Sequence, residues 1–113
     1  MDWVIGARGS GKTTHIIKMA SRYNCDVIVA TEARARDVEY MAHELRMKVP
    51  GIFTIHDVVS GLIGKRHNPV IFDDVQDCLQ VLCLGNQVKG GTLGIGDGDQ
   101  VFSVKTCTDE IKL

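Results

Sequence analysis

Eight residues near the start of the chain, Gly6 to Thr13, read G-A-R-G-S-G-K-T and fit the pattern G-x-x-x-x-G-K-[ST]. In this pattern the glycines let successive backbone N–H groups turn toward a phosphate, and the N-terminus of the following helix adds partial positive charge. We expect Lys12 to reach the β- and γ-phosphate oxygens and the Thr13 hydroxyl to ligate Mg²⁺. The sequence therefore predicts a nucleotide site, whose binding residues are Gly6, Arg8, Gly9, Ser10, Gly11, Lys12, Thr13 and Thr14.

A second group of candidate residues follows an apolar run further along the chain. Val70 to Phe72 are followed by Asp73 and Asp74, which is the form of a Walker B strand that delivers acids beside the phosphates. We expect Asp73 to hold Mg²⁺ and Asp74 to orient or deprotonate an attacking water. Because acidic residues commonly end strands, this pattern gains its weight from being paired with the loop.

Further motifs occur in the same order as in superfamily 1 DNA helicases. Residues 73–77 (D-D-V-Q-D) resemble that family's D-E-x-Q-D motif, and residues 96–102 (G-D-G-D-Q-V-F) resemble its G-D-x-D-Q motif. Residues 54–56 (T-I-H) are similar to a T-x-H element, and residues 31–35 (T-E-A-R-A) more loosely to the T-x-x-x-A segment that lies on single-stranded DNA. Residues 6–102 therefore resemble the first RecA-like motor domain of these helicases, which carries the ATP site.

This resemblance implies cofactors, partners and roles. The cofactors would be ATP and Mg²⁺, and the partner single-stranded DNA or another nucleic acid. Gln100 would join Asp74 in the catalytic set by sensing the γ-phosphate, while Gln76 and His56 would couple nucleotide state to nucleic acid. The weaker candidates for nucleic-acid contact or coupling are Thr31, Arg34, Arg36, His56 and Gln76.

Ordinary structural explanations stay open for several of these residues. Gln100 can simply cap a Gly-rich turn. His56 can be an ordinary residue at a helix start. Arg34 and Arg36 can form a solvated helix face, and Arg8 can point into solvent.

The family pattern is incomplete in this chain. The 113 residues contain no second RecA-like domain with its arginine motifs, and an arginine at the γ-phosphate is worth about 10³–10⁵ in rate. Asp74 stands where the family has Glu, and a misplacement of about 1 Å can cost about 10²-fold. We therefore expect an ATPase that binds ATP and hydrolyses it slowly, unless a partner protein or self-assembly supplies an arginine.

Three other functions are compatible with these residues. One is a non-catalytic, nucleotide-dependent binding module or switch. Another is a nucleoside kinase, because G-K-T-T and an acidic-x-Gln motif also resemble thymidine kinases, although that family's zinc-binding cysteine pairs are absent. The third is a terminase-like ATPase, because R-G-S-G-K is similar to viral DNA-packaging terminases. A small unit with Arg8 in its loop resembles bacteriophage or mobile-element proteins.

Alternating strands and helices must position these residues. The continuous apolar run Val27 to Val29 is typical of a strand that is buried on both faces. We expect an α/β fold of the three-layer, RecA-like P-loop NTPase type, with a mostly parallel five-stranded sheet and one domain spanning residues 1–113. The expected strands are 2–5, 26–31, 52–55, 70–72 and 92–95, with 101–104 a last strand or extended segment, and the expected helices are 14–23, 33–47, 57–63 and 77–84.

Composition narrows the class of protein. The 113 residues carry a net charge of −1, so any nucleic-acid contact must come from a local patch, such as one containing Arg34, Arg36, Lys65 and Arg66. No apolar run reaches eighteen residues, so we expect no membrane span. A loop that starts at the sixth residue argues against a secretory signal. The four cysteines show no metal-ligand spacing, so we expect reduced thiols in the cytoplasm, or the host cytoplasm for a viral protein.

Overall fold

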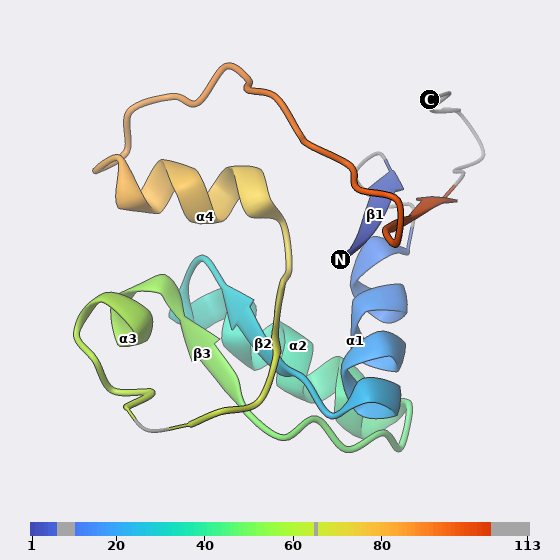
Figure 1. Ribbon diagram of the computed structural model, residues 1–113. Helices are drawn as coiled ribbons and strands as arrows, with labels where there is room; N and C mark the ends of the chain where they lie inside the picture. Colours follow the sequence, from blue (N-terminus) through green and yellow to red (C-terminus); the bar gives the residue numbers. More distant parts are fainter. Residues whose placement is uncertain (7–10, 65, 105–113) are drawn as a thin grey trace.

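Strands and helices alternate along the chain (Figure 1). The computed structural model describes residues 1–6, 11–64 and 66–104. The strands are β1 (Asp2–Gly6), β2 (Asp26–Val29), β3 (Ile52–Thr54), β4 (Val70–Phe72) and β5 (Gln100–Val104). The helices are α1 (Lys12–Tyr23), α2 (Glu32–Glu44), α3 (Ile55–Val59) and α4 (Val75–Leu82). The expectation of an α/β chain is confirmed.

The strands form two small parallel sheets rather than one. β2 is the central strand of a three-stranded sheet ordered β3-β2-β4, and β1 pairs with β5 in a separate two-stranded sheet. Within the described residues no strand pairing joins β1 to β4. The expectation of a single five-stranded sheet is therefore wrong, although the parallel direction of the strands is confirmed.

The strand expected at residues 92–95 is also wrong. Residues 86–96 contain neither helix nor strand and run past α4 toward β5 (Figure 1). Four glycines fall within or beside this stretch: Gly90, Gly91, Gly94 and Gly96. Glycine weakens a strand because it loses the most backbone entropy and packs no side chain. The run Val101 to Val104 lacks glycine, and it is the segment that pairs with β1.

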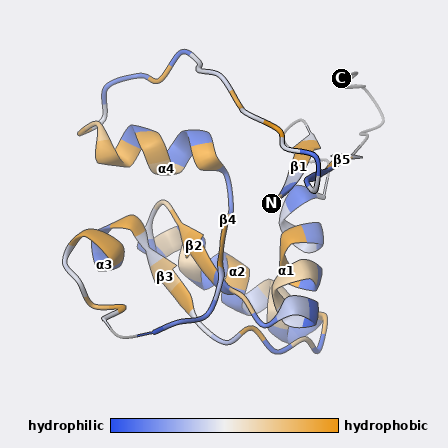
Figure 2. Cartoon of the chain, in the orientation of Figure 1, coloured by the Kyte–Doolittle hydropathy of each residue, from blue (hydrophilic) through white to orange (hydrophobic). Residues whose placement is uncertain are grey.

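The core forms on both faces of β2, whose successive side chains alternate between the faces. Figure 2 shows apolar residues along β2 and β3 and on the helices. On the face covered by α1 and α2, the buried apolar residues are Ile16, Ile17, Ala20, Val27, Val29, Val38 and Ala42. On the face covered by α3 and α4, they are Ile28, Ile55 and Cys78. The expectation that β2 is buried on both sides is confirmed.

Side-chain caps fix where the helices begin. Thr31 accepts a hydrogen bond from the Arg34 backbone N–H and starts α2. Thr54 and Asp57 form a reciprocal capping box, so α3 starts at Ile55, two residues before the predicted start. None of the helices in the described part of the chain has the length and apolar character needed to cross a membrane.

The first residue of β2, whose side chain is buried, makes an ion pair with a partly exposed arginine. Arg66 donates two hydrogen bonds to the Asp26 carboxylate, from Nε to Oδ2 at 3.0 Å and from Nη2 to Oδ1 at 2.8 Å. Asn68 donates a third, at 3.4 Å. The bonds from Arg66, followed by the bond from Asn68, hold the pKa of Asp26 below its ordinary value of 3.8, against the opposing effect of burial. The pair ties the segment before β4 to the start of β2.

This lowered pKa predicts a dependence of stability on pH. A carboxyl group whose pKa is lower in the folded state contributes stability above its unfolded pKa and loses it as pH falls through the folded pKa. The free energy of unfolding should therefore drop as pH falls below about 4, and this drop should be smaller in Asp26→Asn. Urea titrations at a series of pH values measure it, with the exposed Glu39→Gln as control. Equal slopes in Asp26→Asn and the natural protein would contradict the prediction.

Candidate nucleotide site

No side chain of the described residues caps the N-terminus of α1. Gly11 precedes the helix with φ 89°, a left-handed conformation that favours glycine, and it offers no side chain to cap the helix. The first N–H groups of a helix have no partner within the helix and carry its partial positive charge. Lys12 and Thr13 are the first two helical residues, so both lie at this positive end.

The Thr13 side chain contacts Asp73, the other residue that the sequence analysis assigned to Mg²⁺. The Thr13 hydroxyl donates to Asp73 Oδ1 at 3.2 Å, although the two residues lie 60 positions apart in the chain. The Asp73 N–H donates to the Ile28 carbonyl at 2.9 Å, which extends the pairing of β4 with β2 by one residue. This pairing places the Asp73 carboxylate at the carboxyl end of β4, where it is only 3% exposed.

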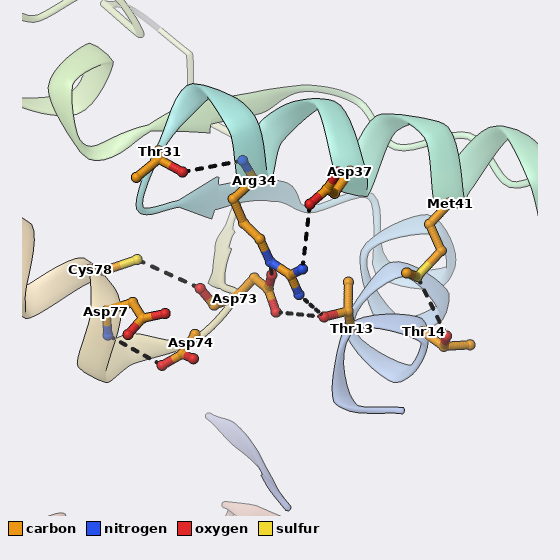
Figure 3. A network of polar contacts seen from close by, with 10 residues as sticks. All are labelled: Thr13, Thr14, Thr31, Arg34, Asp37, Met41, Asp73, Asp74, Asp77 and Cys78. Carbon is orange, nitrogen blue, oxygen red and sulfur yellow. Dashed lines mark hydrogen bonds and ion pairs between the residues drawn. The ribbon is translucent and has the colours of Figure 1, made fainter. Parts of the chain in front are cut away.

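The guanidinium of Arg34 joins this pair (Figure 3). Its Nε donates to Asp73 Oδ2 at 3.0 Å, and its Nη2 donates to the Thr13 hydroxyl oxygen. A weaker contact of 3.9 Å links its Nη1 to Asp37, one helical turn further along α2. The Arg34 side chain is 38% exposed, whereas the Asp73 side chain is almost fully covered. A buried carboxylate therefore has a partly exposed cation as its partner.

Asp74 lies differently from Asp73. Its backbone is left-handed, with φ 60° and ψ 81°, and its Oδ1 accepts a hydrogen bond from the Asp77 N–H at 3.2 Å. Asp and Asn tolerate this conformation better than most residues because their short side chains bond to the nearby backbone. Asp74 thus caps α4, while its neighbour enters the buried contact with Thr13 and Arg34.

The structure does not bring Gln100 to the Thr13–Asp73 pair. Gln100 is the first residue of β5, and in the parallel register it lies opposite Asp2, whereas Gly6 lies opposite Val104. Four residues of extended chain, about 13 Å, separate these two ends of the strand pair. The Gly-rich turn before β5 is closed by Asp99, which accepts a hydrogen bond from the Gly96 N–H at 2.8 Å.

The remaining candidate residues are hydrogen-bonded elsewhere, exposed, or outside the described residues. Thr14 directs its hydroxyl to Met41 Sδ of α2, at 3.6 Å, and Gln76 donates to the Val88 carbonyl at 3.2 Å. Thr31, Arg36 and His56 are exposed. Four residues of the predicted loop lie outside the described residues, namely Ala7, Arg8, Gly9 and Ser10.

The structure gives no support to a basic patch containing Lys65 and Arg66, which the sequence analysis named for nucleic-acid contact. Arg66 is engaged with Asp26 at the amino end of β2, and Lys65 lies outside the described residues.

A pocket of about 440 Å³ adjoins the site. It lies between the start of α2 and α4, and its lining includes Thr31, Arg34, Asp77 and Gln80. Arg34 therefore lines this pocket as well as contacting Thr13 and Asp73. Among the described residues, no group of three or more His, Cys, Asp or Glu side chains gathers as a metal cluster.

The part played by Arg34 was missed at the sequence level, where it counted as a nucleic-acid candidate or a solvated residue. The order of strands and charged residues in the sequence does contain a signal for the contact between Arg34 and Asp73. The carboxyl ends of neighbouring parallel strands meet at one edge of a sheet. Arg34 lies five residues past the end of β2 and Asp73 lies one residue past the end of β4, so their opposite charges can meet if the two strands are adjacent. The sequence alone does not say that β2 and β4 are adjacent.

Cys78 lies beneath the site and is chemically protected. Its thiol donates to the Asp73 carbonyl at 3.6 Å and is buried. Burial, together with the nearby carboxylates of Asp73, Asp74 and Asp77, raises its pKa to about 12. Because the thiolate is the reactive form, Cys78 should be inert near neutral pH.

Thiol labelling checks this protection. At neutral pH we expect N-ethylmaleimide to modify Cys78 at least about tenfold more slowly than the exposed Cys83. Mass spectrometry of the digested protein measures both positions in one sample, and a urea-denatured sample gives the control in which the two react alike. Comparable rates in the folded protein would show that the Cys78 thiol is accessible.

Comparison of the chain with protein-family models, with curated proteins and with solved structures found no match in any of the three. The residues described above are therefore the basis on which a function can be proposed.

Proposed function

We propose that this protein binds a nucleoside triphosphate, ATP, together with Mg²⁺ at the N-terminus of α1. One observation carries this proposal: the Thr13 hydroxyl, at the end of the G-x-x-x-x-G-K-[ST] pattern, lies 3.2 Å from the buried carboxylate that follows β4. Two motifs that the sequence separates by 60 residues thus meet at one uncapped helix end. Lys12, the first residue of that helix, would bind phosphate oxygens as a cation.

The chemistry of the donors fits Mg²⁺. Mg²⁺ prefers oxygen ligands and is usually held by one or two carboxylates, with phosphate oxygens and water filling its other positions. Thr13 and Asp73 offer one hydroxyl and one carboxylate in contact with each other. When bound, the metal would neutralise phosphate charge. The protein's own part is to hold Asp73 rigidly, through its place in the sheet and its burial.

We extend the proposal to a RecA-like, helicase-related ATPase that acts with single-stranded DNA or a protein partner. Supporting it are the parallel β3-β2-β4 sheet, the acid after β4, and two exposed residues, Thr31 and His56, that follow β2 and β3 at the same edge. The place of Gln100 gives this extension no support. The proposed relation to helicases therefore depends on the sequence motifs alone. The proposal of nucleotide binding depends on the motifs and on the contact between Thr13 and Asp73.

A nucleotide-dependent switch without hydrolysis is the second candidate function. The observation that favours it is the use of the Asp74 carboxylate as the cap of α4. A side chain committed to a helix end is less free to orient a water. We propose that hydrolysis, where it occurs, is slow for this reason.

Lysine substitution tests nucleotide binding. Lys12→Ala removes charge-assisted hydrogen bonds to phosphate, each worth about 1.5–3 kcal/mol, so the affinity for Mg·ATP should fall about 10–100-fold. Lys18→Ala removes the same charge from an exposed position on the same helix and should leave the affinity unchanged. Calorimetric titration of both variants measures the difference. Equal affinity in Lys12→Ala and the natural protein would reject the proposed site.

Asp74→Asn separates the two candidate functions. Asn caps helices about as well as Asp and tolerates the left-handed conformation, so the substitution should preserve α4 while removing the carboxylate. For the ATPase we expect turnover to fall about 10²-fold with nucleotide affinity unchanged, in assays with and without single-stranded DNA. Asp97→Asn, at an exposed position, is the control. Unchanged turnover in Asp74→Asn would show that the carboxylate serves as a cap alone, whereas absence of turnover in the natural protein, with nucleotide bound, would favour the switch.

A further inference from the structure

Arg34 takes the hydrogen-bonding positions that a divalent cation at Thr13 and Asp73 would need. A hydroxyl group has one proton to donate and two lone pairs. The Thr13 proton goes to Asp73 Oδ1, and one lone pair accepts from Arg34 Nη2. Asp73 Oδ2 accepts from Arg34 Nε at 3.0 Å. The guanidinium therefore bridges the same two side chains that the proposed function assigns to the metal (Figure 3).

This contact matters because the Asp73 side chain is buried whereas that of Arg34 is partly exposed. The Asp73 side chain is 4% exposed, and a buried carboxylate needs a positive partner or must give up its charge. Arg34 provides that partner from the first turn of α2. Its own side chain is 38% exposed and lines the neighbouring pocket of about 440 Å³, so the guanidinium has open space into which it can withdraw.

We propose that Arg34 is a specificity-determining residue that competes with the divalent cation for Thr13 and Asp73, and so sets how much Mg²⁺ the site requires. This inference rests on the proposed nucleotide site. A guanidinium and a divalent cation that bind the same two side chains repel each other, so the binding of one opposes the binding of the other. Arg34 holds Thr13 and Asp73 together until the metal displaces it toward the pocket.

This role differs from that of a structural ion pair. A purely structural pair would stabilise the fold and leave the Mg²⁺ requirement unchanged. A competitor affects stability and metal binding in opposite directions. Its removal weakens the fold around Asp73 and strengthens the binding of the metal. The concentration of Mg²⁺ at half-saturation is therefore the quantity that distinguishes the two roles.

The test is a nucleotide-binding titration at a series of Mg²⁺ concentrations, ending in excess chelator. Arg34→Gln keeps a polar side chain but removes the charge and the forked donors. Arg34→Lys keeps the charge but cannot bond to both partners through a planar fork. Arg22→Gln is the matched control, since Arg22 is exposed in the last turn of α1, far from Thr13 along that helix.

We expect the Mg²⁺ concentration at half-saturation to fall about tenfold in Arg34→Gln, to fall less in Arg34→Lys, and to stay unchanged in Arg22→Gln. The same half-saturation in Arg34→Gln, Arg34→Lys and the natural protein, with nucleotide still bound and dependent on Lys12, would overturn the inference and leave the proposed function standing. Absence of nucleotide binding in every protein, at every Mg²⁺ concentration, would instead overturn the proposed function.

A second measurement uses the metal alone. Electron paramagnetic resonance of free Mn²⁺ reports its binding to each protein without nucleotide, so it does not depend on nucleotide binding. Tighter Mn²⁺ binding by Arg34→Gln than by Arg22→Gln supports competition, and equal binding contradicts it. If Arg34→Gln fails to fold, as judged by circular dichroism, Arg34→Lys decides the question in both measurements by the same comparison.

Discussion

The buried carboxylate of Asp73 is the group around which this end of the molecule is organised. A charge that is removed from water is costly unless hydrogen bonds and an opposite charge compensate it. Asp73 obtains a hydroxyl from α1 and a guanidinium from α2, while its backbone pairs with β2 and accepts the Cys78 thiol of α4. Three helices and two strands are therefore positioned relative to one residue. A ligand that contacts Asp73 would change the surroundings of all of them.

Local patterns were enough to predict most elements of the fold but not how its sheets divide. The run Val27 to Val29 is apolar without interruption, which indicated a strand buried on both faces, and the structure confirms it. Residues 92–95 looked like a strand by composition, yet Gly94 interrupts them and the chain there stays irregular. Which strands pair is decided by contacts between distant segments, and no local pattern records those contacts.

The candidate site was predictable to the same extent. Thr13 and Asp73 were expected to meet because each motif has a fixed place relative to a strand end, and they do meet. The capping geometry of Asp74 was not anticipated, because an acid at a strand end looks the same whether it faces a ligand or the next helix. The contact of Arg34 with Asp73 was not predicted, because it depends on β2 and β4 being adjacent. Gln100 was tied to the site by resemblance alone.

The division into two sheets has a mechanical consequence. The β1–β5 pair and the three-stranded sheet share no described hydrogen bond between strands, so the pair is held to the larger unit by packing, such as that of Val4 on the core, and it can open at a lower free energy than that unit. The segment between Gly6 and Gly11 joins the end of β1 to the start of α1, which packs on the larger unit. A phosphate bound at the start of α1 would oppose the separate opening of the β1–β5 pair, because a ligand stabilises the folded state to which it binds.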